Sequence, residues 1–258
     1  MIGEEIMTKV IMHGCNGRMG QMISKLAADD PELAIVAGVD INDTIQNPYP
    51  VYRSIEDCKE EADAVIDFGA AAAIDTLLDT CAARNLPVVV CTTGLSEEQI
   101  AHLNETSKKI AVLRSANMSL GINLLMKLLK DAVKTLAPAG FDVEIVEKHH
   151  KMKLDAPSGT ALALADSVNE AMGNTYEYVY DRSQVRQKRG AKELGISAVR
   201  GGTIVGDHDV IFAGEDEVIT FSHTAYSRAV FAKGAICAAK FLAGKGAGLY
   251  NMSDVIGS

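Results

Sequence analysis

Two histidines and three lysines lie within residues 147–161, EKHHKMKLDAPSGTA, of this 258-residue chain. The pKa of histidine suits proton transfer near neutral pH, and lysine supplies fixed positive charge. Pro157 precedes Ser158, Gly159 and Thr160, which predicts a helix start whose backbone amides are open to a carboxylate or phosphate. Cations beside such amides indicate a small anionic ligand.

Two other interpretations of this segment are a metal site and a solvated charged loop. His149 and His150 are adjacent, so in a strand they point to opposite faces, and no Cys or Glu completes a zinc spacing. We therefore expect no metal. A solvated loop is the default for KHHKMK, but the helix start that follows favours a binding site.

Composition excludes several classes of protein. A net charge of −9 disfavours a protein that grips nucleic acid or an anionic membrane. The five cysteines are odd in number and scattered, which predicts reduced thiols in the cytoplasm rather than disulfides. MIGEEIMTKV carries two glutamates where a signal peptide is basic, and aspartates interrupt the apolar runs, so we expect no membrane association. Met1 and Met7 both remain possible starts.

The order of apolar runs predicts an α/β protein with two domains. Residues 9–114 alternate Val/Ile-rich runs with helical stretches, which is typical of a doubly wound, Rossmann-type parallel sheet. The later sequence predicts an amphipathic helix, an alternating strand before His149, a helix from Ser158, a long exposed loop over 173–195 and a hairpin, hence a second α+β domain with a mixed or antiparallel sheet. The last helix is expected to return to the first domain. We expect residues 1–117 and 226–258 to form a dinucleotide-binding domain, and 118–225 a substrate-binding domain.

Three glycines, Gly14, Gly17 and Gly20, lie between the first strand and the first helix. They allow close approach of a pyrophosphate to the helix N-terminus, although a tight turn without a ligand gives the same pattern. Asp40 ends the second strand, where a carboxylate can bind the ribose 2′-OH of a dinucleotide. Ile41 follows instead of a cation, which favours NADH, while Arg18 offers one positive charge to NADPH.

The segment at 147–161 closely resembles the signature of the 4-hydroxy-tetrahydrodipicolinate reductase family. GCNGRMG, CTTG, SANMSLGIN, VRGGTIVGDHDVIF and FSHTAYSRAVFAKGA resemble further blocks of that family across nearly the whole chain. The resemblance implies a homotetramer, with residues 118–225 as the tetramerisation domain, that reduces a cyclic dicarboxylate with NADH or NADPH, in lysine and diaminopimelate biosynthesis. A hydride added to the ring leaves an enamine that needs a proton on the neighbouring carbon, which histidine can supply.

The resemblance also implies roles for individual residues. His149 is the expected general acid, Lys153 assists it or neutralises a carboxylate, and His150 lies at the substrate. Ser158, Gly159, Thr160 and Arg200 complete the expected substrate site. The expected cofactor residues are Gly14, Cys15, Asn16, Gly17, Arg18, Met19, Asp40, Phe68, Cys91, Thr92, Thr93, Ser115, Ala116, Asn117 and Met118.

The chain departs from the family pattern at three places. Cys91 replaces a usual glycine, Ile41 replaces an arginine found in some members, and DFGAAAA is plainer than the usual DFTxPxx. Without the family, Arg200 would be an ordinary surface charge. His13 is expected to be packed in its strand, and His102 to be solvated on a charged helix.

Two rival functions remain open at this stage. One is a different NAD(P)-dependent dehydrogenase that uses the same His and Lys on another anionic substrate. The other is a dinucleotide-sensing regulator, which predicts a basic recognition helix; only the RSQVRQKRGAK segment is strongly basic, and it has the composition of a loop.

Overall fold

The structure is a computed structural model that describes residues 7–183 and 186–257. The chain divides into two compact units. One contains the residues up to Ser119 together with those from Ala229 onward, and the other is Leu120–Arg228. The second unit is therefore inserted into the sequence of the first.

The first unit contains a seven-stranded sheet in the order β12-β6-β5-β4-β1-β2-β3, in which every neighbouring pair is parallel. This confirms the predicted doubly wound parallel sheet. Its strands are β1 (Thr8–His13), β2 (Leu33–Val39), β3 (Val51–Tyr52), β4 (Ala64–Asp67), β5 (Val88–Val90), β6 (Ala111–Arg114) and β12 (Gly248–Tyr250).

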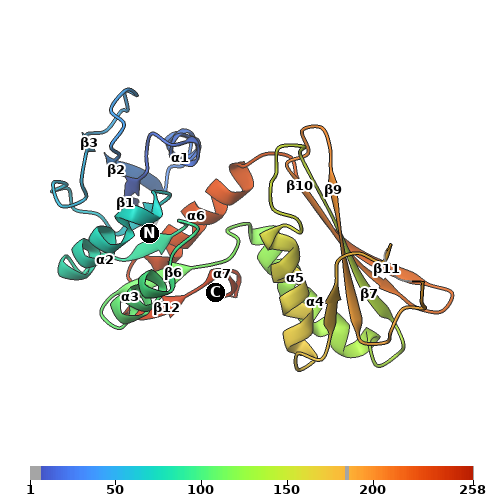
Figure 1. Cartoon of the computed structure of the whole chain (residues 1–258). Coiled ribbons are helices and arrows are strands. Elements are labelled where there is room, and N and C mark those ends of the chain that lie inside the picture. The colour runs from blue at the N-terminus through green and yellow to red at the C-terminus, as the bar shows by residue number, and fades with distance from the viewer. Residues whose placement is uncertain (1–6, 184–185, 258) are drawn as a thin grey trace, which may run out of the picture. The chain divides into compact units, whose positions relative to one another are not determined.

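Helices cover both faces of this sheet (Figure 1). They are α1 (Arg18–Ala28), the short 3-10 helix η1 (Ala71–Ala73), α2 (Ile74–Ala83), α3 (Glu97–Ser107), α6 (Ala229–Leu242) and α7 (Met252–Ile256). Val10 and Met12 of β1 pack in the core under α1 and α6, and Ile11 packs in the opposite core under α2 and α3. The continuous apolar run of β1 thus fits a strand that is buried on both faces.

The second unit contains a five-stranded mixed sheet in the order β11-β10-β7-β9-β8. Strand β10 is antiparallel to β7 and β11, while β7 and β8 run parallel to β9. The strands are β7 (Asp142–His149), β8 (Glu177–Val179), β9 (Glu193–Arg200), β10 (Gly206–Ala213) and β11 (Val218–Ala225). The mixed sheet and the β10–β11 hairpin confirm the prediction for this half.

Helices α4 (Leu120–Leu136) and α5 (Gly159–Ala171) pack side by side on one face of the second sheet (Figure 1). Residues of β7 alternate between buried and half-buried, and Val143 and Ile145 lie in the core beneath the helices. Glu147 and His149 follow with the same period of two, so they lie on the helix side of the sheet.

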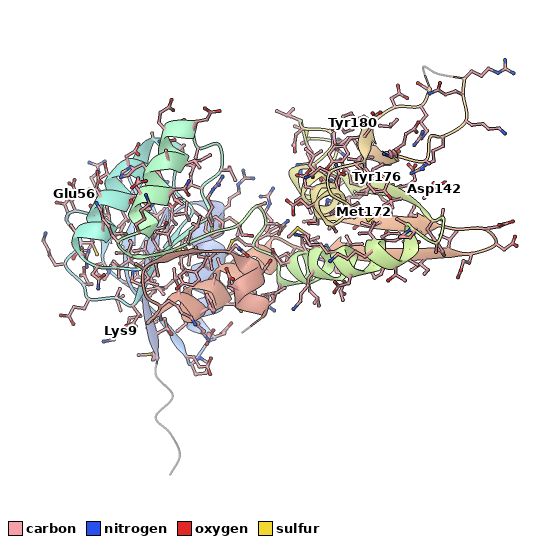
Figure 2. All side chains as sticks on the ribbon, turned by 90° about the horizontal axis from the view of Figure 1, so that it is seen from below. Lys9, Glu56, Asp142, Met172, Tyr176 and Tyr180 are labelled. Atoms are coloured by element: carbon pink, nitrogen blue, oxygen red, sulfur yellow. The ribbon has the colours of Figure 1, made fainter. Side chains whose placement is uncertain are left out.

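The expected long exposed loop over 173–195 is only partly correct, and residues 184–185 lie outside the described residues. Strand β8 forms within it, and Tyr176 packs against the core near Met172 (Figure 2). Arg182 and Arg189 both bind Glu144 on β7. Ion pairs and one short strand therefore anchor a segment whose composition resembles a solvated loop.

No helix among the described residues combines the length and the apolar character needed to cross a bilayer.

Candidate active site

The glycine turn between β1 and α1 has a backbone that requires glycine. Gly14 has φ +79°, and a Cβ there would lie 2.6 Å from the carbonyl oxygen of Phe68. A Cβ on Gly20 would lie 2.3 Å from the carbonyl oxygen of Gly14, so the helix packs closely on the turn. Gly17 is the N-cap of α1 and makes no side-chain capping bond, and the first turn carries no acidic residue. An anion at this helix start meets backbone amides for which no acidic residue of the first turn competes.

A pocket of about 330 Å³ opens at this turn, within the first unit. Four of the predicted cofactor residues line it, namely Gly14, Gly17, Asp40 and Phe68. The other lining residues are His13, Val39, Ile41, Arg53, Gly69, Ala70 and Ala73. The cavity combines the polar backbone of the turn, the Asp40 carboxylate at a strand end and an apolar wall. These features fit a nucleotide whose ribose lies at Asp40.

Asp40 connects the end of β2 to the glycine turn. Its Oδ2 accepts a hydrogen bond from the Asn16 amide at 2.9 Å, and its Oδ1 accepts one from the Asn42 amide at 2.9 Å. Because a carboxylate has several acceptor positions, it can accept hydroxyl hydrogens as well. Asp40 is thus fixed in orientation at the pocket.

The remaining cofactor candidates lie at the same edge of the sheet but outside the pocket lining. Cys15 is fully buried, and burial together with the nearby Asp40 raises the pKa of its thiol to about 11, so only its backbone is suited to a ligand. Thr92 donates to the Gly69 carbonyl at 3.1 Å and ties two strand ends together. Arg18 and Met19 begin α1; Cys91 and Thr93 follow β5; and Ser115, Ala116, Asn117 and Met118 follow β6.

Arg53 is a pocket residue that the sequence analysis missed. Val39 pairs with Tyr52 in the parallel register of β2 and β3, and the Asp40 amide donates to the Tyr52 carbonyl at 2.9 Å. Arg53 therefore emerges beside Asp40. Its side chain is exposed and reaches the Ile41 carbonyl at 3.5 Å, and it forms no ion pair with the other described residues. The only available signal was a lone arginine after a two-residue strand.

His13 and Asp67 form a buried pair beneath the pocket. His13 Nδ1 lies 2.7 Å from Asp67 Oδ1, which also accepts the Gly69 amide at 2.8 Å. His13 is packed in its strand as expected, and it is also held by a carboxylate.

In the second unit, one buried carboxylate connects three structural elements. Glu147 is fully buried, and its Oε2 lies 2.6 Å from Nδ1 of His149. Its Oε1 accepts the Ser158 amide at 3.0 Å, and Arg200 donates to both oxygens at 2.7 Å. Burial alone would raise the pKa of Glu147, but the hydrogen bonds from Arg200, His149 and Ser158 hold it below its usual value. Glu147 is therefore an anion at neutral pH.

The N-terminus of α5 begins beside this carboxylate. Ser158 caps the helix by accepting the Ala161 amide at 3.1 Å. Gly159 is exposed, with open space where a Cβ would lie, and the first turn contains no acidic residue. Gly159 thus stands exposed at the start of α5 and Thr160 follows it, a position that suits an anionic group.

His208 is a second buried histidine, and its ring meets that of His149 edge to face at 5.2 Å between centroids. Its Nε2 lies 3.0 Å from Oγ of Ser158. Burial, reinforced by the nearby His149, lowers the pKa of His208 to about 4. His208 is therefore neutral at neutral pH and hydrogen-bonds to the cap of α5.

The two predicted cations after β7 lie close to His149 in sequence. His150 is half-buried just past the strand end. The Lys153 ammonium binds the Asp155 carboxylate at 2.8 Å, and the Lys153 amide donates to the His150 carbonyl at 3.1 Å, so the segment forms a turn.

Two residues have partners that the sequence analysis did not foresee. Arg200 was expected to belong to the substrate site; its guanidinium binds Glu147, and it also donates to the Asp155 carbonyl at 2.6 Å. His102 was expected to be solvated, but its two ring nitrogens lie 2.7 Å from Asp75 and 3.0 Å from Asp79. In both cases the partner comes from a distant part of the sequence.

Comparisons with known proteins identify the family. Residues 8–118 match the family described as dihydrodipicolinate reductase, N-terminus, and residues 121–256 match dihydrodipicolinate reductase, C-terminus. A 4-hydroxy-tetrahydrodipicolinate reductase from Caldanaerobacter subterraneus subsp. tengcongensis is 56% identical and spans 97% of this chain and 99% of its own length. One from Clostridium tetani is 47% identical and spans 98% of both.

A solved structure has the same fold. The dipicolinate-bound dihydrodipicolinate reductase from Paenisporosarcina sp. TG-14 gives a TM-score of 0.80 at 24% identity, over 95% of this chain and 98% of that one. Matches in both halves favour a reductase over the other dehydrogenases and the sensor. The chain belongs to the dihydrodipicolinate reductase family and is an oxidoreductase that uses a nicotinamide dinucleotide.

Proposed function

We propose that this enzyme reduces 4-hydroxy-tetrahydrodipicolinate to tetrahydrodipicolinate with NAD(P)H, in lysine and diaminopimelate biosynthesis, and that His149 donates the proton. The observation that carries this proposal is the group formed by His149, Glu147 and the start of α5. It combines an acid-base side chain with an open helix N-terminus.

We assign the role of proton donor to His149 because one of its ring nitrogens is held and the other remains for a ligand. Its Nδ1 is engaged by Glu147, which leaves Nε2 as the nitrogen that exchanges a proton with a ligand. Loss of the 4-hydroxyl group of the substrate as water leaves an unsaturated ring, and the nicotinamide, when bound, supplies the hydride that reduces it. The carbon beside the reduced ring position then needs a proton, and the protonated His149 delivers it.

The two carboxylates of the substrate require positive charge and hydrogen-bond donors. We assign one carboxylate to the amides of Gly159 and Thr160 at the start of α5. Lys153 and His150 follow on the same turn and offer cations to the other carboxylate or to the ring. Asp155 holds the Lys153 ammonium until an anionic ligand competes for it.

The dinucleotide is assigned to the pocket at the glycine turn, with its pyrophosphate at the start of α1 and its adenosine ribose at Asp40. We propose that NADH is preferred, because Asp40 accepts ribose hydroxyls and repels a 2′-phosphate. Arg53 stands beside Asp40 and offsets that repulsion, so NADPH is also accepted.

We further propose a homotetramer that works in the cytoplasm. The face of the second sheet opposite α4 and α5 exposes apolar side chains, including Val199 of β9 and Val218 of β11, and such a face suits a partner subunit. The five free cysteines suit a reducing compartment. Light scattering during size-exclusion chromatography tests the tetramer; a monomer at micromolar concentration would contradict it.

The experiment that tests the reaction follows the loss of nicotinamide absorbance when the purified protein meets freshly generated substrate. NADH and NADPH are compared in parallel, with dipicolinate as a competing analogue because a solved relative binds it. Rapid oxidation of either cofactor supports the proposal. Folded protein that binds dinucleotide but oxidises neither would overturn it.

A further inference from the structure

Glu147 is held by donors from three elements of the second unit. His149 approaches from β7 itself, Ser158 from the cap of α5, and Arg200 from the end of β9. Strands β7 and β9 are parallel with His149 opposite Arg200, so the arginine necessarily emerges next to the histidine. The contacts of 2.6 to 2.7 Å from His149 and Arg200 are those of charge-assisted hydrogen bonds.

The carboxylate also has a role in the charge balance around His149. Glu147 is fully buried, and the Arg200 side chain is only 20% exposed. Buried charges are retained where opposite charges and donors surround them. The other titratable groups facing this cluster are His208 and His223 from the hairpin, and Lys153 with Asp155 from the turn after β7.

We propose that Glu147 and Arg200 are positioning residues for His149. Glu147 holds the Nδ1 proton, so that Nε2 is the nitrogen that gives and regains the catalytic proton. Arg200 fixes the carboxylate plane with its two parallel bonds and limits how strongly Glu147 stabilises the imidazolium. This inference rests on the proposed role of His149 as proton donor.

The same carboxylate links the proton donor to the substrate-binding amides. Oε2 orients His149, and Oε1 holds the Ser158 amide one residue before Gly159. A single rigid group therefore sets the spacing between the acid and the start of α5. Glutamine cannot reproduce this, because one of its two terminal atoms is a donor that faces His149 and Arg200 donors.

The first test identifies the tautomer of His149 in the wild-type protein by ¹⁵N NMR of histidine-labelled full-length chain, assigned with His149→Gln. The neutral ring is expected to carry its proton on Nδ1. A proton found on Nε2 overturns the proposal. This measurement needs no turnover, so it remains decisive even if the proposed reaction fails.

The second test compares the pH dependence of kcat in two variants. Glu147→Gln removes a negative charge and is expected to move the pH at which activity falls downward by about one unit. Arg200→Met removes a positive charge and is expected to move it upward. Turnover in Glu147→Gln should fall tenfold or more, with a smaller change in KM.

The matched control is Glu144→Gln, which alters a carboxylate on the other face of the same strand that pairs with Arg182 and Arg189. Its pH profile should match wild type. Circular dichroism and NADH binding verify folding. Arg200→Lys keeps the positive charge, so the pH at which its activity falls should lie closer to the wild-type value than in Arg200→Met. Shifts in the same direction for Glu147→Gln and Arg200→Met, or no shift in either, would contradict the proposal.

Discussion

A Cβ on Gly206, the first residue of β10, would lie 3.0 Å from Nε2 of His149, the last residue of β7. The absence of a side chain at Gly206 therefore gives the imidazole its space. Gly206 has no positive φ, so the position favours glycine because of the space that a side chain would occupy and not because of backbone freedom.

Gly206→Ala should lower turnover on the order of tenfold, because a displaced imidazole delivers its proton poorly. NADH affinity should not change. Gly201→Ala is the control, since nothing lies within 4 Å of a Cβ at Gly201. Steady-state kinetics of both variants decide the matter, and equal turnover in the two would show that His149 tolerates the methyl group.

His149→Gln should lower kcat roughly a hundredfold or more, the effect expected for losing a general acid. Dinucleotide binding should persist, as followed by quenching or enhancement of NADH fluorescence. His102→Gln provides a histidine control in the first unit and should keep wild-type kcat. Wild-type turnover in His149→Gln would remove this residue from the mechanism.

Lys153→Ala should raise KM for the dicarboxylate and also lower kcat, by about tenfold in kcat/KM, because the substrate carboxylate assigned to Lys153 loses its cation. Lys151→Ala, two residues earlier and exposed, is the matched control. The inhibition constant of dipicolinate gives an independent readout of binding. If both lysine variants behave alike, Lys153 is simply a solvated charge.

Arg53→Ala should weaken NADPH binding on the order of tenfold and leave NADH within about twofold, since only NADPH carries the 2′-phosphate. Dissociation constants for both cofactors, with 2′-AMP and 5′-AMP as fragments, measure this directly. Arg18 begins α1, where we assign the pyrophosphate that both cofactors share. Arg18→Ala should therefore weaken NADH and NADPH to the same extent; a loss confined to NADPH would instead support the sequence-based expectation that Arg18 offers its charge to NADPH. If Arg53→Ala weakened NADH and NADPH binding equally, Arg53 would contact a chemical group that both cofactors share.

His102 should stabilise the first unit in a pH-dependent manner. Its hydrogen bond to Asp75 is the chief cause of a raised pKa, and His102 in turn lowers the pKa of Asp75. A raised histidine pKa contributes stability below the unfolded value near 6.5, which is lost as pH rises through the folded value. The Asp75 contribution is lost as pH falls below its own usual range, so the effect is largest near pH 5 to 6.

His102→Gln should therefore lower the thermal unfolding midpoint by about 1–2 °C at pH 5.5 and leave it unchanged at pH 9, since exposed ion pairs are weak. Differential scanning calorimetry at the two pH values checks this. Lys108→Gln, which breaks an exposed pair at the C-terminal end of the same helix, is the control. A constant difference at both pH values would show that the loss is one of packing and not of charge.

The sequence predicted the elements with strong periodicity. The apolar run of β1, the glycine turn and the alternation of β7 all lie within single segments, where local spacing determines the structure. Strands β3 and β12 are only two and three residues long, too short for a pattern. The family resemblance named His149 and Lys153 but not Glu147, although its two-residue spacing from His149 in an alternating strand indicates that the two side chains share a face.

The missed contacts depend on strands or helices that are distant in the sequence and meet in the fold. Arg200 approaches Glu147 only because β9 pairs with β7, and Arg53 reaches the pocket only because β3 pairs with β2. His102 meets Asp75 because α3 packs beside α2. Each of these contacts follows from the complete fold, so a single charged residue in the sequence gave no indication of its partner.

The insertion of the second unit into the first determines the order in which the protein can mature on the ribosome. Strand β12 completes one edge of the seven-stranded sheet, and α6 supplies buried residues from Ala232 to Leu242 to one of its cores. The first unit thus stays unfinished until residues 229–257 have been translated, whereas Leu120–Arg228 is contiguous and has all its strands earlier. Nascent chains halted before Ala229 are therefore expected to expose the α6 side of the parallel sheet to chaperones, and synthesis of α6 is the step that ends this exposure.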